Sequence, residues 1–531
     1  MAGKDYRCTW GSILLLAPLI CSQVFAQSAA QVEPANYKGT IVLVHGAWGG
    51  GWAFREVDRL LSVDGYKVYR PTLTGQGERS HLSSPNIDLS NHIQDVVNLI
   101  EWENLHNVIL IGHSYGGMVI TGVVDRIPNR VKQVIYLDAF APENGESGEV
   151  MRKMAKNPLN LTEKDGFFVP TWLKPDALLP HDVLMPVKTF SEAITLKNQD
   201  KARKISTAYI LTVDPGKQPE DDPFYSSYQR AGQRGWKTMV MEGDHNVQWS
   251  RPKQLVTYLE CAAEMKDPKE AGIALPAPEP APLGAPTVGI AAGKSTYVIV
   301  HGAWGGGYAF KTVDELLTGD GHKVYCPTLT GLGEHFNLSN PNIDLSTHIQ
   351  DVVNVILWED LHDVVLVGHS YGGMVITGVA DRVPERIKHI VYVDAFLPND
   401  GESLNTARGP SPARGPTTAR SARRGGGTNV PAGFRAIGNY DPNRPPPHDV
   451  PQSEKTFSEV EVLRNQNAVK RIPATYILNT THADLKPEGA QFYFFYQRAK
   501  ERGWDMHITQ SDHNIQTSHP RDLVTFLEDV K

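Results

Sequence analysis

The segment VILIGHSYGGMVITGVVDR, residues 108–126, predicts the fold of this chain. Its first four residues form a continuous apolar run, which predicts a strand buried on both faces in a parallel sheet. The residues from Gly116 onward predict a helix, and the glycines that flank Ser114 and its two neighbours predict a turn too tight for larger residues. Such a unit lifts the Ser114 hydroxyl to the carboxyl edge of the sheet, where folds of this kind bind ligands.

This strand–turn–helix unit occurs twice in the chain. Residues 364–382 read VVLVGHSYGGMVITGVADR, so that Ser370 repeats Ser114 about 256 residues later. A period of this length is far longer than a solenoid unit and indicates a duplicated domain. Three further pairs follow in the same order: IVLVHGA at 41–47 and YVIVHGA at 297–303, YLDAF at 136–140 and YVDAF at 392–396, and GDHN at 243–246 and SDHN at 511–514.

The 531 residues divide into four predicted segments. Residues 1–26 have a weakly basic start, an apolar run and a small residue at the cleavage position, which is typical of a signal peptide. We expect domain one at 35–265, an Ala/Pro-rich linker at 266–293 and domain two at 294–531. Because short apolar strands alternate with amphipathic helices, each domain is predicted to be an α/β fold with a mostly parallel, doubly wound sheet.

The apolar runs and the net charge of the chain indicate its expected location and argue against two kinds of partner, the membrane and nucleic acid. The apolar run within residues 1–26 is too short to span a membrane comfortably, and no later segment resembles a membrane span. We therefore expect a secreted or periplasmic protein with no stable membrane insertion. The formal net charge of −7 argues against a nucleic acid partner. The oligomeric state stays open.

Two histidines and two pairs of backbone donors complete a candidate catalytic set. A serine hydroxyl is a weak nucleophile unless a base takes its proton, and His245 and His513 each lie just past a late strand. An oxyanion needs two fixed N–H donors, one from the residue after the serine and one from the HGAW loop. The expected donors are Tyr115 and Ala47 in the first repeat, and Tyr371 and Ala303 in the second.

These motifs together resemble one branch of a known superfamily. HGAW, PTLTGQGER, GHSYGGMV, YLDAF and GDHN are similar to the hydroxynitrile lyase and plant methylesterase-like branch of the α/β-hydrolase superfamily, which includes bacterial carboxylesterases. The resemblance covers nearly all of both repeats. It implies carboxylic ester hydrolysis without a cofactor or metal, or reversible cyanohydrin cleavage in a few members. The lyases use a lysine near the histidine, but Asn246 and Val247 follow His245 here, which favours an esterase.

The acid that orients the histidine has two candidates. Asp138 and Asp394 end equivalent strands, so the repeat symmetry favours them. Asp214 follows the next strand of the first repeat, and the usual pattern of α/β-hydrolases favours an acid there. Opposite Asp214 the second repeat has Thr481, with Asp484 nearby. The sequence leaves both assignments open, and the symmetric one is preferred.

A cap is predicted within each domain, and the two caps differ. Residues 147–198 interrupt the hydrolase core of domain one, and their apolar side chains can line a substrate pocket or form the cap's own core. The matching region of domain two holds TARGPSPARGPTTARSARRGGGTN at 406–429, which is too rich in Arg, Gly and Pro to bury a core. Domain two is therefore expected to carry a low-complexity cap insertion.

Three functions are compatible with these patterns. The leading prediction is a serine hydrolase that cleaves small carboxylic esters or lactones through an acyl-enzyme intermediate. The second is a C–C lyase of the hydroxynitrile lyase type. The third is a ligand-binding module, with a vestigial triad in domain two.

Overall fold

The computed structural model describes residues 37–156, 158–174, 176–279, 293–407, 430–437, 440–481 and 486–530. Residues Asn36–Lys531 form one compact unit. The predicted signal peptide, the linker residues 280–292 and the Arg/Gly-rich cap residues 408–429 lie outside the described residues. No helix of the described residues combines the length and the apolar character needed to cross a membrane.

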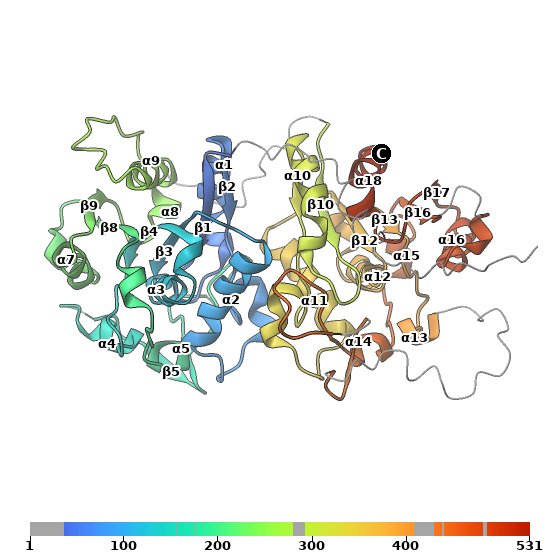
Figure 1. Cartoon of the computed structure of the whole chain (residues 1–531), viewed down its shortest axis with the longest axis horizontal. Coiled ribbons are helices and arrows are strands. Elements are labelled where there is room, and N and C mark those ends of the chain that lie inside the picture. The colour runs from blue at the N-terminus through green and yellow to red at the C-terminus, as the bar shows by residue number, and fades with distance from the viewer. Residues whose placement is uncertain are drawn as a thin grey trace, which may run out of the picture. The chain divides into compact units, whose positions relative to one another are not determined.

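Each repeat is built on a six-stranded parallel sheet, and the two sheets have the same strand order (Figure 1). The first sheet has the order β2 (Tyr66–Tyr69), β1 (Gly39–Val44), β3 (Val108–Ser114), β4 (Val131–Ala139), β8 (Ser206–Val213) and β9 (Lys237–Glu242). The second has the order β11 (Lys323–Tyr325), β10 (Thr296–Val300), β12 (Val364–His369), β13 (Ile387–Val393), β16 (Ala474–Asn479) and β17 (Asp505–Thr509). The predicted pair of α/β domains with parallel sheets is confirmed.

Helices alternate with the strands in both repeats. The helices of the first repeat are α1 (Arg55–Val63), α2 (Leu89–Trp102), α3 (Gly116–Arg126), α4 (Gly148–Lys153), α5 (Lys188–Ser191), α6 (Gln199–Ala202), α7 (Tyr225–Gln233), α8 (Val247–Ser250) and α9 (Pro252–Ala263). Those of the second are α10 (Lys311–Gly319), α11 (Leu345–Trp358), α12 (Gly372–Arg382), α13 (Leu404–Ala407), α14 (Lys455–Ser458), α15 (Gln466–Val469), α16 (Tyr493–Glu501), α17 (Ile515–Ser518) and α18 (Pro520–Glu528).

The central strands are buried on both faces because helices cover both faces of each sheet. In the first repeat, Ile41 and Leu43 of β1 pack in the apolar cluster that contains α1 and α9. Val42 and Val44, which point to the opposite face, pack in the cluster that contains α2, α3 and α7. Full burial of one such side chain stabilises the fold by about 1.5–3 kcal/mol. This two-sided burial explains why the strand runs are continuous rather than alternating.

The start of helix α2 is fixed by a reciprocal cap. The Asp88 carboxylate accepts the Asn91 N–H, and the Asn91 side chain accepts the Asp88 N–H. A cap of this kind contributes about 1 kcal/mol. From this cap onward most apolar residues of α2 are buried as far as Trp102, which packs in the apolar cluster of the second repeat. In the second repeat the Asp344 carboxylate caps α11 by accepting both the N–H and the hydroxyl of Thr347.

The cap of the first repeat lies between β4 and β8. It contains α4, α5, α6 and the short strands β5 (Thr162–Lys164), β6 (Phe167–Val169) and β7 (Met185–Pro186). Met151 is buried, whereas Leu178 is 88% exposed, so the apolar cap residues divide between a core and the surface. The described part of the second cap contains α13, α14, α15, β14 (Phe434–Arg435) and β15 (Gln452–Ser453).

The two repeats contact each other through equivalent elements. Helix α2 packs against the 3₁₀ turn η6 (Gly333–Leu338), and α11 packs against the equivalent turn η2 (Gly77–Leu82). Asn98 Nδ2 donates to the Glu334 carbonyl at 2.7 Å, and Asn354 Nδ2 donates to the Glu78 carbonyl at 2.6 Å. The contact is therefore reciprocal, as in an isologous interface between two subunits.

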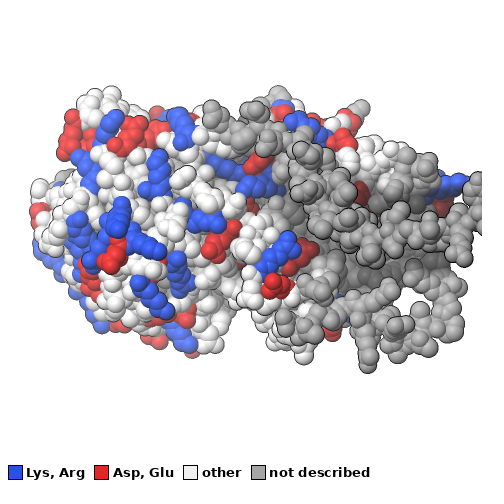
Figure 2. All heavy atoms as spheres, viewed as in Figure 1, with Lys and Arg blue, Asp and Glu red and all other residues white. Residues whose placement is uncertain are grey.

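Positive and negative side chains are intermixed on the face shown in Figure 2. On the described residues of this face, Lys and Arg form no single continuous patch of the kind that attracts polyanions.

Candidate active site

The backbone of Ser114 is held in a strained conformation at the junction of β3 and α3. Its φ is 57°, and the equivalent Ser370 has a φ of 53°. Left-handed backbone is unfavourable for residues other than glycine and is typical of functional turns. The neighbours must be glycines: a Cβ on Gly46 would lie 2.9 Å from the Ser114 Cβ, and one on Gly116 would lie 2.7 Å from the Val44 carbonyl oxygen. The turn thus brings the serine against the loop that follows β1.

The structure brings His245 and Asp138 together. His245 Nδ1 donates to Asp138 Oδ2 at 2.6 Å. The Asp138 side chain is fully buried, and its Oδ1 accepts the Thr212 N–H at 3.0 Å. Because the carboxylate binds Nδ1–H, the imidazole is held in the tautomer that leaves Nε2 free to accept a proton.

The second repeat contains the same pair. His513 Nδ1 donates to Asp394 Oδ2 at 2.6 Å, and Asp394 Oδ1 accepts the Asn479 N–H at 3.2 Å. Burial raises the pKa of the Asp394 carboxyl. The geometry predicted from the repeat symmetry is therefore present in both halves of the chain.

Asp214, the alternative acid, lies apart from this pair. It is exposed just after β8, and no hydrogen bond joins it to His245 within the described residues. Its counterpart Thr481 is also exposed, and Asp484 lies outside the described residues.

The charge state of His245 is set by opposing effects. Burial lowers its pKa, the hydrogen bond and the negative charge of Asp138 raise it, and the net shift of the pKa is upward. The neighbouring His113 is different, because burial holds its pKa well below the ordinary value and keeps the ring neutral. His113 Nε2 lies 2.8 Å from the His245 carbonyl oxygen, so His113 anchors the loop that carries His245.

The four predicted oxyanion donors lie beside the two serines. Ala47 follows Gly46 in the loop after β1 and lines the same cavity as Ser114. Tyr115 is the N-cap residue of α3, and its buried hydroxyl contacts His92 Nδ1 at 3.1 Å. Ala303 and Tyr371 occupy the equivalent positions in the second repeat, where the Tyr371 hydroxyl contacts His348.

A cavity of about 440 Å³ opens onto Ser114 and His245. Its walls include several aromatic side chains: Trp48 and the cap residue Trp172 meet edge-on at 5.1 Å, and Phe224 stacks on the His245 ring at 5.0 Å. The other lining residues from the cap include Arg152, Leu159, Leu161, Asp182 and Phe190. The cavity is of the size and character that bind small apolar ligands.

The sequence reasoning missed Asp222, which also lines the cavity. Burial and the negative charge of Asp138 raise the pKa of Asp222 to about 7. Its Oδ1 accepts the Phe224 N–H at 2.7 Å. The duplication does not single out this residue, because the first repeat reads DPF at 222–224 where the second reads AQF at 490–492.

The site of the second repeat keeps the phenylalanine that stacks on the histidine but lacks the counterpart of Asp222. Phe492 stacks on the His513 ring at 4.9 Å, as Phe224 does on His245. Ala490 stands where the first repeat has Asp222. The guanidinium of Arg435 lies over the Phe457 ring at 4.9 Å. Among the described residues of both repeats, no group of three or more His, Cys, Asp or Glu side chains is arranged to hold a metal ion.

Curated relatives include esterases of bacteria and plants. The chain is 57% identical over 106 residues to the carbendazim hydrolyzing esterase of Nocardioides sp. (strain SG-4G), a match that covers 20% of this chain and 44% of that protein. It is 24% identical over 246 residues to pheophorbidase of Raphanus sativus, covering 41% of this chain and 91% of that protein. The chain thus spans less than half the length of the carbendazim esterase, and 34% of the putative methylesterase 11 of Arabidopsis thaliana. The predicted likeness to plant methylesterases is confirmed.

One solved structure and one family model match parts of the chain. An extracellular alpha/beta-hydrolase from a Paenibacillus species is 25% identical, and the match covers 42% of this chain and 98% of that one with a TM-score of 0.33. The alpha/beta hydrolase family matches residues 41–257 and again residues 297–526. The chain therefore belongs to the alpha/beta hydrolase family, with one matched segment in each repeat.

Proposed function

We propose that the protein is a serine hydrolase that cleaves small carboxylic esters or lactones through an acyl-enzyme intermediate. The observation that carries this proposal is the His245–Asp138 hydrogen bond of 2.6 Å at the cavity that also contains Ser114. The esterases among the relatives support the same class of reaction.

In the proposed mechanism, His245 Nε2 takes the proton of Ser114 as the hydroxyl oxygen attacks the ester carbonyl. The N–H groups of Ala47 and Tyr115 stabilise the oxyanion, and loss of one such donor costs on the order of 100- to 1000-fold in rate. His245 then protonates the leaving alcohol, and water repeats the attack on the acyl-serine. Asp138 orients the imidazole and stabilises its charged form throughout.

The two repeats are proposed to share the chemistry unequally. Both hold a serine on a left-handed turn and a His–Asp pair. Apolar cap residues, among them Leu159, Leu161 and Trp172, line part of the Ser114 cavity, and such a lining reduces contact with water and strengthens the electrostatic interactions inside. We expect the Ser114 site to turn over most apolar ester, and the Ser370 site to contribute weakly or on small substrates.

A lyase and a binding module are the alternatives. A hydroxynitrile lyase of this branch needs a lysine near the histidine, and the residues after His245 are Asn246 and Val247. Rapid mixing with a short p-nitrophenyl ester separates the three functions. A hydrolase releases a burst of nitrophenol and leaves an acyl group on Ser114 that mass spectrometry detects. A lyase instead cleaves a cyanohydrin, and a binding module gives neither product. Absence of the burst and of the acyl group in the folded full chain contradicts the proposal.

Residues 1–26 support a further proposal, that the protein is exported and is secreted or periplasmic. Sequencing the N-terminus of the protein recovered from the periplasm and the medium tests cleavage after Ala26. A cell-retained chain that starts at Met1 contradicts export.

A further inference from the structure

The reciprocal contact between the repeats ends at two tryptophans, one in each repeat. Trp102 is the last residue of α2, and Trp358 is the last residue of α11. Trp102 is 7% exposed and belongs to the apolar cluster of the second repeat. Its ring lies 5.6 Å from the Tyr308 ring of that repeat. A residue of the first repeat therefore completes the packing of the second.

Each tryptophan also contacts a histidine in the cap of the opposite repeat. The ring of Trp358 lies 5.4 Å from the ring of His181, in the first cap. The ring of Trp102 lies 5.2 Å from the ring of His448, in the second cap. Since His181 and His448 occupy equivalent places in the repeated motif PHDV, the two contacts are copies of one another.

The first of these caps connects directly to the candidate oxyanion loop. Next to His181, Asp182 lines the Ser114 cavity and accepts the Trp172 indole N–H at 2.7 Å. The following residue, Val183, donates its N–H to the carbonyl oxygen of Trp48 at 2.8 Å. Trp48 is the neighbour of Ala47, so a continuous path of contacts runs from the opposite repeat to the loop that faces Ser114.

The second cap repeats the backbone connection, while the aspartate next to its histidine has a different partner. The Tyr308 hydroxyl lies 3.4 Å from Asp449 Oδ1, beside His448. Val450 donates its N–H to the Trp304 carbonyl oxygen at 2.9 Å. Trp304 follows Ala303, the candidate oxyanion donor of the second repeat.

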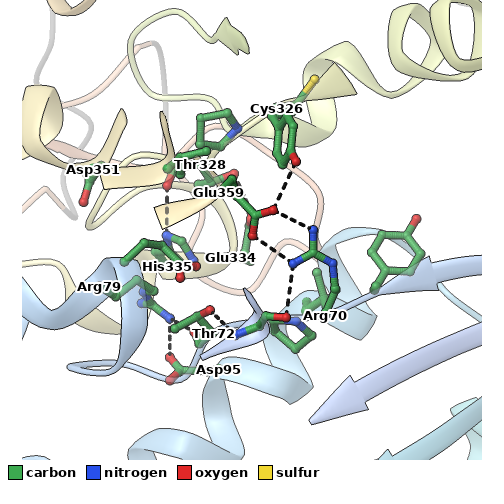
Figure 3. Close-up of a pocket in the computed structure, with 18 of the residues that line it drawn as sticks. Arg70, Thr72, Arg79, Asp95, Cys326, Thr328, Glu334, His335, Asp351 and Glu359 are labelled. Atoms are coloured by element: carbon green, nitrogen blue, oxygen red, sulfur yellow. Dashed lines mark hydrogen bonds and ion pairs between the residues drawn. The ribbon is translucent and has the colours of Figure 1, made fainter. Parts of the chain in front are cut away.

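The end of α11, which contacts the first cap, has stronger ionic contacts with the opposite repeat than the end of α2, which contacts the second cap. Figure 3 shows Arg70 and Glu359 facing each other across the repeat contact. Arg70 donates to both carboxylate oxygens of Glu359, at 2.9 and 3.1 Å, and Arg55 Nη2 donates to the Trp358 carbonyl oxygen at 2.7 Å. Such forked guanidinium–carboxylate pairs hold a fixed geometry. In the second half, Cys326 replaces Arg70, and the remaining cation is Lys311, whose Nζ donates to the Glu103 carbonyl oxygen at 2.7 Å and lies 3.4 Å from Glu103 Oε2.

We propose that each repeat positions the cap and the oxyanion loop of the other: Trp358 is a positioning residue for the Ser114 site, and Trp102 is one for the Ser370 site. The tryptophans touch no substrate and act through His181 and His448. The proposal rests on the proposed esterase function for its kinetic readout. The amide contacts of Val183 and Val450 give a second readout that needs no substrate.

The test uses the full chain in two backgrounds, Ser370→Ala to isolate the Ser114 site and Ser114→Ala to isolate the Ser370 site. Hydrogen exchange is followed at the Val183 and Val450 amides, and kcat and KM are measured with a p-nitrophenyl ester. Trp358→Ala is expected to speed exchange at Val183 roughly tenfold and to raise KM at the Ser114 site about three- to tenfold, with little change at Val450. Trp102→Ala is expected to give the crossed result, at Val450 and the Ser370 site.

His181→Ala is the milder variant, because it removes the contact from the cap side and leaves the buried tryptophan in place. It is expected to reproduce the effect of Trp358→Ala at the Ser114 site, and the double variant is expected to add no further loss. His448→Ala is the matched control and is expected to leave the Ser114 site unchanged.

The opposite pattern overturns the proposal. If Trp358→Ala impairs its own Ser370 site and leaves Val183 exchange unchanged, the tryptophan is an ordinary core residue of its repeat. Unchanged Val183 exchange in folded His181→Ala overturns it equally, even if the tryptophan variants fail to fold. A chain without esterase activity but with crossed exchange effects would refute the esterase proposal and retain this one.

Discussion

His245 Nδ1 lies 2.6 Å from Asp138 Oδ2, and the carboxylate sits at the end of a strand rather than on a loop. The φ of Asp138 is 44°, and the φ of Asp394 is the same. In both repeats a non-glycine residue is therefore held in left-handed backbone to aim a carboxylate at a histidine. Strain of this kind persists only where the surroundings enforce it, and it clusters at functional sites.

Replacing Asp138 by Asn tests its proposed role. The amide still fits the site, but it cannot enforce the imidazole tautomer that accepts a proton, so kcat is expected to fall by about 10⁴-fold. Asp214→Asn is the matched control, because it makes the same chemical change at an exposed carboxylate, and it is expected to lower kcat less than threefold. The measurement is ester hydrolysis in the Ser370→Ala background. A larger loss for Asp214→Asn in folded protein would move the acid to that position.

The pH dependence of the Ser114 site follows from His245. The base must be neutral to accept a proton, and its pKa is shifted upward from 6.5 chiefly through Asp138, with Asp222 adding to the shift. The kcat/KM of the Ser370→Ala variant is therefore expected to fall as pH decreases, with the midpoint above 6.5. Asp222→Ala removes one source of negative charge and should move this midpoint to lower pH. A midpoint that is unchanged in Asp222→Ala would show that Asp222 does not act on the histidine.

Single serine variants of the full chain test how much each of the two sites contributes to ester hydrolysis. Ser114→Ala is expected to remove most of the kcat/KM on long-chain esters, because the apolar cavity of about 440 Å³ adjoins Ser114. Ser370→Ala is expected to remove only a minor part. A greater loss in Ser370→Ala would contradict the proposed difference between the two sites.

The ion pair between the repeats makes a prediction about stability. Arg70→Met leaves the Glu359 carboxylate largely buried with a weaker set of partners, and removal of one partner of a buried pair destabilises by about 3–5 kcal/mol. The double variant Arg70→Met/Glu359→Leu is expected to recover part of that loss. Both are measured by urea unfolding. If the double variant regains stability, the loss in Arg70→Met came from the unpaired Glu359 charge. If it does not, the loss came from packing.

The same pair sets a pH dependence for unfolding. Burial raises the pKa of Glu359, but Arg70 and Arg55 outweigh it and the folded-state pKa lies well below 4.5. The pair therefore contributes stability above about pH 4.5, and this contribution is lost as pH falls further. The difference in urea stability between the native chain and the double variant Arg70→Met/Glu359→Leu is expected to shrink below that pH. A constant difference would exclude Glu359 as its source.

The sequence predicted the sheets for physical reasons, and it favoured the His–Asp pairs without deciding between Asp138 and Asp214. A G-x-S-x-G turn between a strand and a helix is compatible with few folds. The duplication showed which aspartates occupy equivalent strand ends. Asp222 was not found because a carboxylate in a loop gives no signal until burial and the nearby Asp138 are known. The contact between the repeats was not found either. Trp102 continues the apolar stripe of α2, and periodicity alone does not reveal whether such a residue faces its own sheet or another repeat.

The exchange of Arg70 for Cys326 has a consequence for how this protein can change. In a homodimer encoded by a single-copy gene, each substitution at a two-fold interface occurs twice, and both copies of a contact are gained or lost together. A tethered pair escapes this coupling, because each half of the interface has its own codons and the linker keeps the halves at high local concentration. One half can therefore keep the Arg70–Glu359 ion pair while the other half changes its sequence at the equivalent position. The two sites are then free to specialise on different substrates within one molecule.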